Sequence, residues 1–392
     1  MKLKKRSLIQ IISVLVVSIN LILYYLYLKD RLDFRTFSVA DLNPYAGWSH
    51  LKAYFTDVSY RFRGITIGIA LSLALVLNAL IFGRLFCGYI CPIGSSQDFS
   101  NHLGRKLGFK EIKISETKSF KFEYIKYIVL IVALVLSILG AGSILAKLSP
   151  WIGFLNIFMG LTLSYGLIVF CVILIISLFI RRPFCRGFCP LGAFFSLISA
   201  LGFTKIKNDK DCKGCSVCLA ECPVEITKAV EGQIPPECVN CLECVENNCI
   251  KNDSGFQLSL FNKKINTKLY IAVGLISFLV IFSMVPYFNF AKTTNTSMIA
   301  SDLNDGNYIG TGVGFGGTMY IDLSIENEKI KSIEVKSHRE TSGYYEEVFK
   351  NLSRDIIRTQ DLNLDVISGA TASTRGFTSA VKNAVGQSMA VD

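Results

Sequence analysis

Two cysteine-rich runs in the middle of the chain have a spacing suited to binding metal clusters. The first run has three cysteines three residues apart and a fourth that precedes a proline: Cys212, Cys215, Cys218 and Cys222. The second has the same spacing with one more residue before its last cysteine: Cys238, Cys241, Cys244 and Cys249. Three close thiolates and a more distant fourth are typical of 4Fe–4S clusters. Zinc also accepts four thiolates, but its sites favour paired knuckles, so the spacing predicts two iron–sulfur clusters.

The two runs resemble those of bacterial two-cluster ferredoxins, in which the fourth cysteine of each run binds the other cluster. The resemblance implies that one cluster is held by Cys212, Cys215, Cys218 and Cys249. It implies that the other is held by Cys238, Cys241, Cys244 and Cys222. The chain departs from the family pattern at Cys249, which comes one residue late and is not followed by proline.

Two further cysteine pairs belong to a motif that occurs twice. Residues 84–94 read RLFCGYICPIG, and residues 182–192 read RPFCRGFCPLG. Positions four apart on a helix share a face, so two pairs around a pseudo-twofold axis could give four thiolates to a further iron–sulfur cluster. Those thiolates would come from Cys87, Cys91, Cys185 and Cys189. The arginines would offset the cluster's negative charge, and each proline would end or re-aim its helix. A thiol–disulfide redox pair and plain structural thiols are the alternatives.

A hydroxyl-bearing motif near the C-terminus could fasten a nucleotide covalently. Residues 365–371 read Asp-Val-Ile-Ser-Gly-Ala-Thr. A hydroxyl can attack a pyrophosphate, and the small residues Gly369 and Ala370 let a bulky nucleotide approach the backbone. The alternative is a helix N-cap followed by a flexible turn, a role that Thr374 could also fill.

This motif resembles the flavin attachment site of the covalent-FMN domains in Rnf and sodium-pumping NADH:quinone oxidoreductase complexes. Two upstream segments resemble the same domains: the glycine-spaced run at 305–317 and the loop at 338–343, where Ser342 replaces a proline. The resemblance implies that Thr371 forms a phosphoester with FMN, made by a separate flavin transferase. The other expected FMN-binding residues are Asp365, Ser368, Gly369, Ala370, Glu340 and Thr341. We assign no catalytic residue, since no general acid, base or substrate nucleophile is evident.

The composition predicts an integral membrane protein. Of the 392 residues, 51% are hydrophobic and only 18% are charged. Apolar segments of about the 20 residues that cross a bilayer are expected as spanning helices. They occupy 8–28, 64–86, 123–147, 161–180 and 268–290. The net charge of +11 fits basic residues that flank membrane helices on the cytoplasmic side. Nucleic acid is not an expected partner, because no basic, aromatic-interleaved binding motif accompanies that charge.

The expected fold is an α-helical membrane bundle with a two-cluster ferredoxin-like α+β insert and a C-terminal α+β FMN-binding domain. Residues 1–204 form the membrane domain of four helices with the two cysteine-pair motifs. Residues 205–262 form the cytoplasmic ferredoxin domain, residues 263–291 the fifth membrane helix, and residues 292–392 the extracytoplasmic FMN domain. Five spans from a cytoplasmic N-terminus place the last domain outside the inner or plasma membrane.

Local patterns predict the elements of the C-terminal domain. Alternating apolar residues favour strands at 319–325 and 330–335, and helices are expected near 344–359 and 374–389.

The membrane part with its paired cysteine motifs resembles the NosR/NapH family of membrane polyferredoxins. The resemblances together imply an electron-transfer protein in which a cytoplasmic donor reduces the clusters. Electrons then pass through the membrane to covalent FMN on the outer face, which serves an extracytoplasmic acceptor. Two alternatives stay open: a subunit of an Rnf-like ion-pumping redox complex, and a membrane redox sensor or regulator. If every cluster lies at the cytoplasmic side, the hop across a core about 30 Å thick is long.

Overall fold

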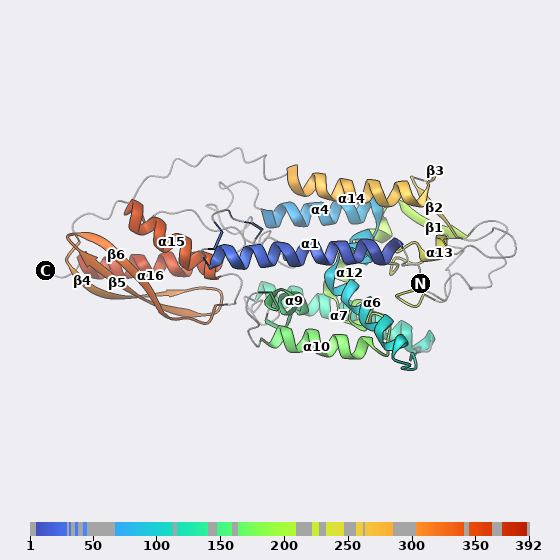
Figure 1. Ribbon diagram of the computed structural model, residues 1–392, viewed down its shortest axis with the longest axis horizontal. Coiled ribbons are helices and arrows are strands. Elements are labelled where there is room, and N and C mark those ends of the chain that lie inside the picture. The colour runs from blue at the N-terminus through green and yellow to red at the C-terminus, as the bar shows by residue number, and fades with distance from the viewer. Residues whose placement is uncertain are drawn as a thin grey trace. The chain divides into compact units, whose positions relative to one another are not determined.

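The computed structural model of the chain (Figure 1) comprises two compact units. The structure describes residues 5–29, 31–32, 36–37, 42–44, 67–112, 116–139, 147–158, 164–208, 222–226, 233–246, 256–261, 263–284, 303–340, 345–362 and 371–389. The first unit comprises Met1–Ile19, Ala70–Phe154 and Tyr165–Val285. The second comprises Asn20–Ile69, Leu155–Ser164 and Pro286–Asp392.

Each of the five expected spans overlaps a long helix. These helices are α1 (Lys5–Leu28), α4 (Ile67–Phe82), α7 (Glu116–Ile138), α10 (Tyr165–Ser177) and α14 (Thr267–Met284). Within the described part of the chain, one helix, Arg6–Leu28, is long and apolar enough by itself to cross a membrane. Other apolar helices, such as Ala70–Phe82 and Thr267–Ile281, are shorter. The five spans therefore stay a prediction.

The repeated motif folds the same way twice. In the first copy, α4 is followed by α5 (Leu85–Tyr89) and α6 (Pro92–Lys106). In the second copy, α10 is followed by α11 (Pro183–Gly187) and α12 (Pro190–Leu201). In both copies the proline after the second cysteine is the first residue of a new helix, where its missing N–H is not needed. The short helix α9 (Pro150–Asn156) lies between the copies in the sequence.

The insert of the first unit is a small antiparallel sheet with a buried core. Strand β2 (Phe256–Leu260) pairs with β1 (Thr204–Asn208) and β3 (Lys263–Lys264). Helix α13 (Glu243–Glu246) lies within the second cysteine run and contains Cys244. Apolar side chains from β1, β2, α5 and α14 surround the buried cysteines of this insert in one core.

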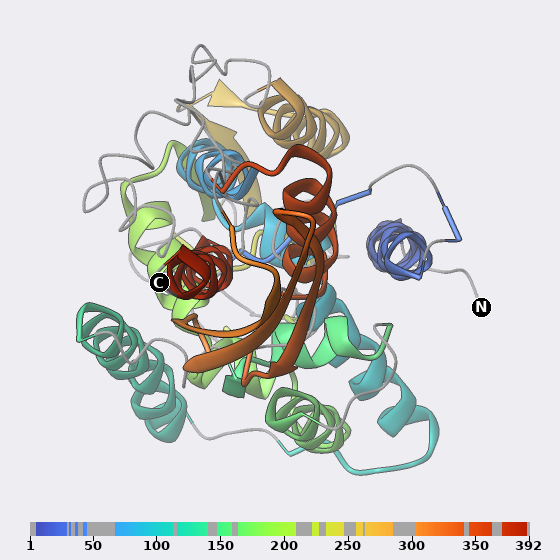
Figure 2. The same ribbon diagram turned by 90° about the vertical axis from the view of Figure 1, so that its left-hand side faces the viewer.

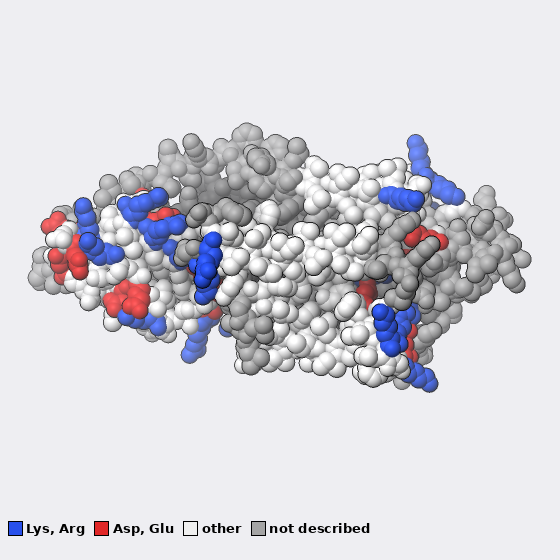
Figure 3. Space-filling view, in the orientation of Figure 1, with Lys and Arg blue, Asp and Glu red and all other residues white. Residues whose placement is uncertain are grey.

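The long helices of the first unit expose apolar side chains. Val16 on α1, Ile131 on α7, Ile175 on α10 and Leu279 on α14 are between 59% and 61% exposed. On the face shown in Figure 3, the surface over α1 and α14 is almost free of charge, and charged groups of this unit gather near β1–β3 and α13. Apolar surfaces this extensive on a monomer indicate contact with a membrane or a partner.

The second unit contains a three-stranded antiparallel sheet covered by two helices. The sheet order is β4 (Gly306–Val313), β5 (Thr318–Glu326) and β6 (Lys329–Ser337). Helix α16 (Thr371–Met389) packs along β4 and β5, while α15 (Tyr345–Thr359) packs on β6. Figure 2 shows α16 and the sheet side by side. The core is made of alternating β5 side chains and one face of each helix. These elements confirm the strands and helices expected here, and β4 is an addition.

Candidate functional site

The four cysteines of the repeated motif lie at the ends of four elements. Cys87 lies in α5 and Cys185 in α11, while Cys91 and Cys189 are the N-cap residues of α6 and α12. The expectation that each pair shares one helical face is wrong, because each short helix ends before its second cysteine. Burial raises the pKa of the Cys91 thiol, and the other three thiols lie close enough to raise it further. The structure thus gathers all four thiols at one place.

One arginine from each copy of the motif binds a side chain that follows the other copy. Arg182 of the second copy donates to both carboxylate oxygens of Asp98, over 2.8 and 2.6 Å, and to the Cys87 carbonyl. Arg84 of the first copy donates to the hydroxyl of Ser196 over 3.0 Å. Asp98 and Ser196 hold equivalent positions, since both the arginines and their partners are offset by 98 residues. The pseudo-twofold relation inferred from the motif is therefore present in the packing of the side chains.

Four cysteines of the insert lie together in the core. Cys222, Cys238, Cys241 and Cys244 are all buried, and all belong to the same apolar cluster. Burial, reinforced by the neighbouring Cys241 thiol, raises the pKa of Cys222 to about 11. These are the four ligands that the ferredoxin resemblance assigns to one cluster. The other assigned set, Cys212, Cys215, Cys218 and Cys249, lies outside the described residues.

The surroundings of these thiols fit an iron–sulfur cluster. Burial opposes the thiolate form that a cluster requires, and bound iron offsets that cost. Among the residues that the structure describes, no three His, Cys, Asp or Glu side chains are grouped closely enough to hold a single metal ion. In a 4Fe–4S cluster each thiolate binds a different iron, so the sulfur atoms lie further apart than around one zinc ion. The preference for clusters over zinc rests on the spacing of the cysteines in the sequence.

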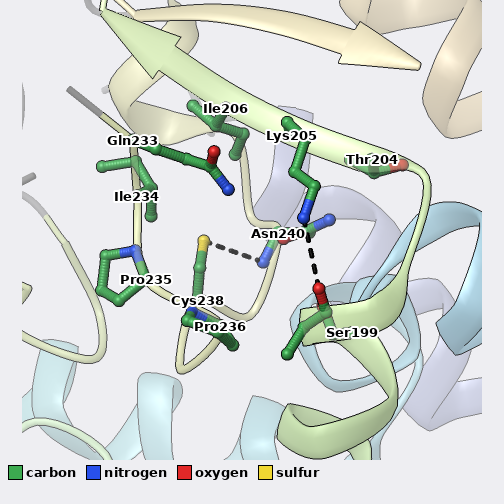
Figure 4. A pocket seen from close by; sticks show the side chains of 11 residues that line it. Ser199, Thr204, Lys205, Ile206, Gln233, Ile234, Pro235, Pro236, Cys238 and Asn240 are labelled. Carbon is green, nitrogen blue, oxygen red and sulfur yellow. Dashed lines mark hydrogen bonds between the residues drawn. The ribbon is translucent and has the colours of Figure 1, made fainter. Parts of the chain in front are cut away.

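Backbone groups approach one of these sulfur atoms. The Asn240 N–H donates to Cys238 Sγ over 3.3 Å. Figure 4 shows both residues at a hollow that is also lined by Lys205 and Ile206 of β1 and by Pro235. Such N–H to sulfur contacts tune the reduction potential of a cluster.

The buried cysteines of the insert and the half-buried cysteines of the repeated motif lie on adjoining segments of the first unit. The Tyr89 hydroxyl of α5 donates to the Cys241 carbonyl over 2.8 Å, and the Asn240 side chain donates to the Phe82 carbonyl over 3.0 Å. A Cβ added to Gly88, next to Cys87, would lie 2.5 Å from the Val239 carbonyl oxygen. The insert loop therefore packs directly on the loop that carries the first motif, a contact that no sequence pattern predicts.

The flavin motif leads into the N-terminus of a helix. Thr371 is the first residue of α16, and the free N–H groups of a first helical turn favour a phosphate. The expected FMN-binding residues Asp365, Ser368, Gly369, Ala370 and Thr341 lie outside the described part of the chain.

Glu340 links the segments that resemble covalent-FMN domains. One of its carboxylate oxygens accepts from the Gly316 N–H over 2.8 Å, and the other accepts from the Ser373 hydroxyl. The carboxylate therefore joins the glycine run, its own loop and the first turn of α16. Ser373 was not expected as a site residue, because only the burial of its hydroxyl against Glu340 identifies it. Thr374 lies buried inside α16, so its expected N-cap role is wrong.

Small residues let α16 lie close to the sheet. A Cβ added to Gly312 in β4 would lie 2.0 Å from the Gly376 carbonyl oxygen, and one added to Gly310 would lie equally close to the Ala380 carbonyl. The glycine run at 305–317 thus serves helix packing in its first part and reaches the Glu340 carboxylate in its second.

The C-terminal turns of α1 belong to the unit that contains the FMN domain. The Tyr24 hydroxyl donates to Glu347 over 2.9 Å, and both side chains are buried. Lys350 donates to the Tyr27 carbonyl over 2.9 Å and lies over the Tyr27 ring. Helix α15 is therefore attached to the end of a helix long enough to span a membrane.

Two family models match the sequence. One, described as a 4Fe-4S binding domain, matches residues 65–110 and 162–208. It covers both copies of the cysteine-pair motif and confirms the internal repeat. The other, described as an FMN-binding domain, matches residues 314–386.

Curated relatives match the chain over about half its length or more. The uncharacterized protein MJ0750 of Methanocaldococcus jannaschii is 36% identical over 198 residues, which cover 50% of this chain and 81% of that protein. The regulatory protein NosR of Pseudomonas aeruginosa is 30% identical over 261 residues, 59% of this chain and 36% of NosR. The putative electron transport protein YccM of Escherichia coli is 27% identical over 226 residues, 55% of this chain and 62% of YccM. The chain therefore belongs to the same family as MJ0750, is similar to NosR and YccM over part of their length, and joins 4Fe-4S binding segments to an FMN-binding domain.

Proposed function

We propose that this chain carries electrons across a membrane, from a cytoplasmic reductant through 4Fe–4S clusters to covalent FMN that serves an extracytoplasmic acceptor. The observation that carries this proposal is the contact, within one unit, between the segments that hold two sets of four cysteines, one buried and one half-buried. Electron transfer between cofactors needs them held close together in a fixed geometry, and the protein's part is to supply that position and its electrostatics.

The bound clusters would supply one-electron redox chemistry, while the chain's own residues hold and shield them. Cys222, Cys238, Cys241 and Cys244 would ligate one cluster. The four cysteines of the repeated motif would ligate a further cluster, and the remaining ligand set comes from the part of the insert outside the described residues. A cluster between the two copies of the motif would lie further along the path than the insert and would shorten the hop that a membrane imposes.

The exposed apolar faces of the long helices support a membrane location. Side chains such as Val16, Ile131 and Leu279 are stable in lipid and unfavourable in water. We place the N-terminus and the ferredoxin domain in the cytoplasm, because Lys and Arg residues precede the first helix and occur throughout the 92–122 and 181–267 loops, whereas the 148–160 loop has none. The FMN domain then lies outside, where a flavin transferase would load it.

At the flavin end, the Thr371 oxygen would carry the FMN phosphate. The first turn of α16 supplies N–H groups to the phosphate, and Glu340 fixes the neighbouring loop through Gly316 and Ser373.

The test is in-gel flavin fluorescence after denaturation, with the chain co-expressed with an exported flavin transferase. The wild type should fluoresce and Thr371→Ala should be dark. Thr378→Ala removes the same groups from the same helix seven residues later and should fluoresce like the wild type. A dark wild type, or a fluorescent Thr371→Ala band, would contradict the covalent assignment.

Iron analysis tests the cluster at the repeated motif separately. Cys91→Ser with Cys189→Ser should lower the iron content by about a third, since one of three clusters is lost. Cys171→Ser, a change at an exposed thiol of α10, is the control and should leave iron unchanged. Iron that stays constant in the double variant would contradict this cluster.

A regulatory role is the second candidate, because the matched NosR of P. aeruginosa is named a regulatory protein. It predicts partner binding that depends on the clusters, with no steady electron flux to the flavin. Flux measured in closed vesicles separates the two roles.

A further inference from the structure

The two crossing arginines differ in their charge partners. Arg182 is fully buried, and its charge is balanced by Asp98, which also pairs with Arg6. Arg6 in turn lies 3.8 Å from the Glu243 carboxylate. This side of the repeat therefore holds two guanidinium groups and two carboxylates, so its charges cancel.

The equivalent residue Arg84 has no carboxylate partner of this kind. Arg84 is 2% exposed, and its partners are the Ser196 hydroxyl and the Glu237 carbonyl, at 3.0 and 2.9 Å. The Glu237 carboxylate instead accepts from the Tyr127 hydroxyl and lies 4.0 Å from Lys126 Nζ, and Glu123 also lies near Lys126. Among the described residues, no carboxylate forms an ion pair with the Arg84 guanidinium.

Arg84 lies where the two cysteine sets meet. A Cβ added to Gly192, three residues after Cys189, would lie 3.0 Å from Arg84 Nη2. On its other side Arg84 binds the carbonyl of Glu237, the residue before Cys238. The Arg84 charge is therefore close to ligands of both proposed clusters.

We propose that Arg84 is the positioning residue that raises the reduction potential of these two clusters, through a charge that Ser196 leaves without a carboxylate partner. The proposal rests on the proposed function, in which these thiols hold clusters. Reduction of either cluster takes one electron from a one-electron donor and adds one negative charge, and no bond forms or breaks. A buried positive charge nearby favours that step in both clusters.

The chain offers variants that change the charge in two independent ways. Arg84→Gln removes the charge, and Arg84→Lys keeps it. Ser196→Asp gives Arg84 the partner that Arg182 already has, and Ser196→Asn changes the size equally without a charge. The readout is a redox titration of the purified full chain, followed by the EPR signals of its reduced clusters.

Arg84→Gln and Ser196→Asp should each lower the equilibrium constant for reduction of the flanking clusters by about tenfold, a shift of about 59 mV. Arg84→Lys and Ser196→Asn should retain potentials close to that of the wild type. Unchanged potentials in Arg84→Gln and Ser196→Asp, with all signals present, would overturn the proposal.

Structural damage gives a different pattern. If Arg84→Gln alone loses its clusters, the proposal is tested by comparing the cluster potentials of Ser196→Asp and Ser196→Asn. Loss of clusters from all four variants would overturn the proposal, because packing and not charge would then govern this site. A wild type without cluster signals would instead contradict the proposed function itself.

Discussion

Replacing Asp98 with asparagine should strongly destabilise the first unit. Asp98 accepts two hydrogen bonds from Arg182 and also pairs with Arg6. Although burial raises the pKa of Asp98, the charges of Arg182 and Arg6 outweigh it and hold that pKa below its ordinary value. The carboxylate is therefore ionised at neutral pH, and its loss leaves the fully buried Arg182 without its counter-charge. Breaking such a pair on one side costs about 3–5 kcal/mol.

The assay is unfolding of the detergent-solubilised chain by SDS, followed by tryptophan fluorescence. Trp151 is buried within the first unit and reports on its packing. A double-variant cycle separates the pair from its surroundings, with Asp98→Asn, Arg182→Gln and both changes together. The double variant should lose less than the sum of the two single variants, by at least about 1.5 kcal/mol.

Two results would refute this reasoning. A loss below about 0.5 kcal/mol for Asp98→Asn would be typical of an exposed surface site and would show that the pair is solvated. If the losses in free energy of unfolding of the two single variants add up to the loss of the double variant, Asp98 and Arg182 do not interact.

Two further predictions concern the FMN domain. Burial lowers the pKa of His338, which packs against Tyr345, so the folded state binds fewer protons than the unfolded state. The contribution of His338 to the free energy of unfolding should therefore be fully present above the unfolded pKa of about 6.5 and should fall on acidification below it. His338→Gln should weaken this pH dependence, as measured by unfolding midpoints from pH 7.5 to 5. Gly312→Ala should cost about 1–3 kcal/mol or more, because the new methyl meets the Gly376 carbonyl oxygen. Gly386→Ala, where nothing lies within 4 Å, is its control and should be neutral or stabilising in the same unfolding assay; equal behaviour of the two variants would contradict the close packing.

Much of the FMN domain follows from local sequence pattern. The alternation that predicts a strand at 319–325 corresponds to β5, whose inward side chains Met319, Ile321 and Leu323 are fully buried. Strand β4 was not expected, because its glycines hide the alternation. Those glycines are explained by α16, a helix more than 50 residues away in the sequence.

The local structure of the cysteine-pair motif differs from the one that its spacing predicts. The spacing of Cys87 and Cys91 suggested one helical face. The proline after Cys91 instead starts a new helix, so Cys87 lies in α5 and Cys91 is the N-cap residue of α6. The carboxylate partner of Arg182 and the hydroxyl partner of Arg84 are side chains that cross between the copies. Such contacts form only in the folded repeat, so no local pattern could reveal them.

The central claim is that electrons pass through this chain from the clusters to the flavin. The most direct measurement reconstitutes the flavinylated chain in closed vesicles, adds a membrane-impermeant reductant on the side of the ferredoxin insert, and follows flavin absorbance. The account predicts rapid flavin bleaching in the wild type and none in Cys238→Ser or Cys189→Ser. Bleaching at the wild-type rate in both variants would contradict it, as would a wild-type flavin that stays oxidised while the clusters are reduced.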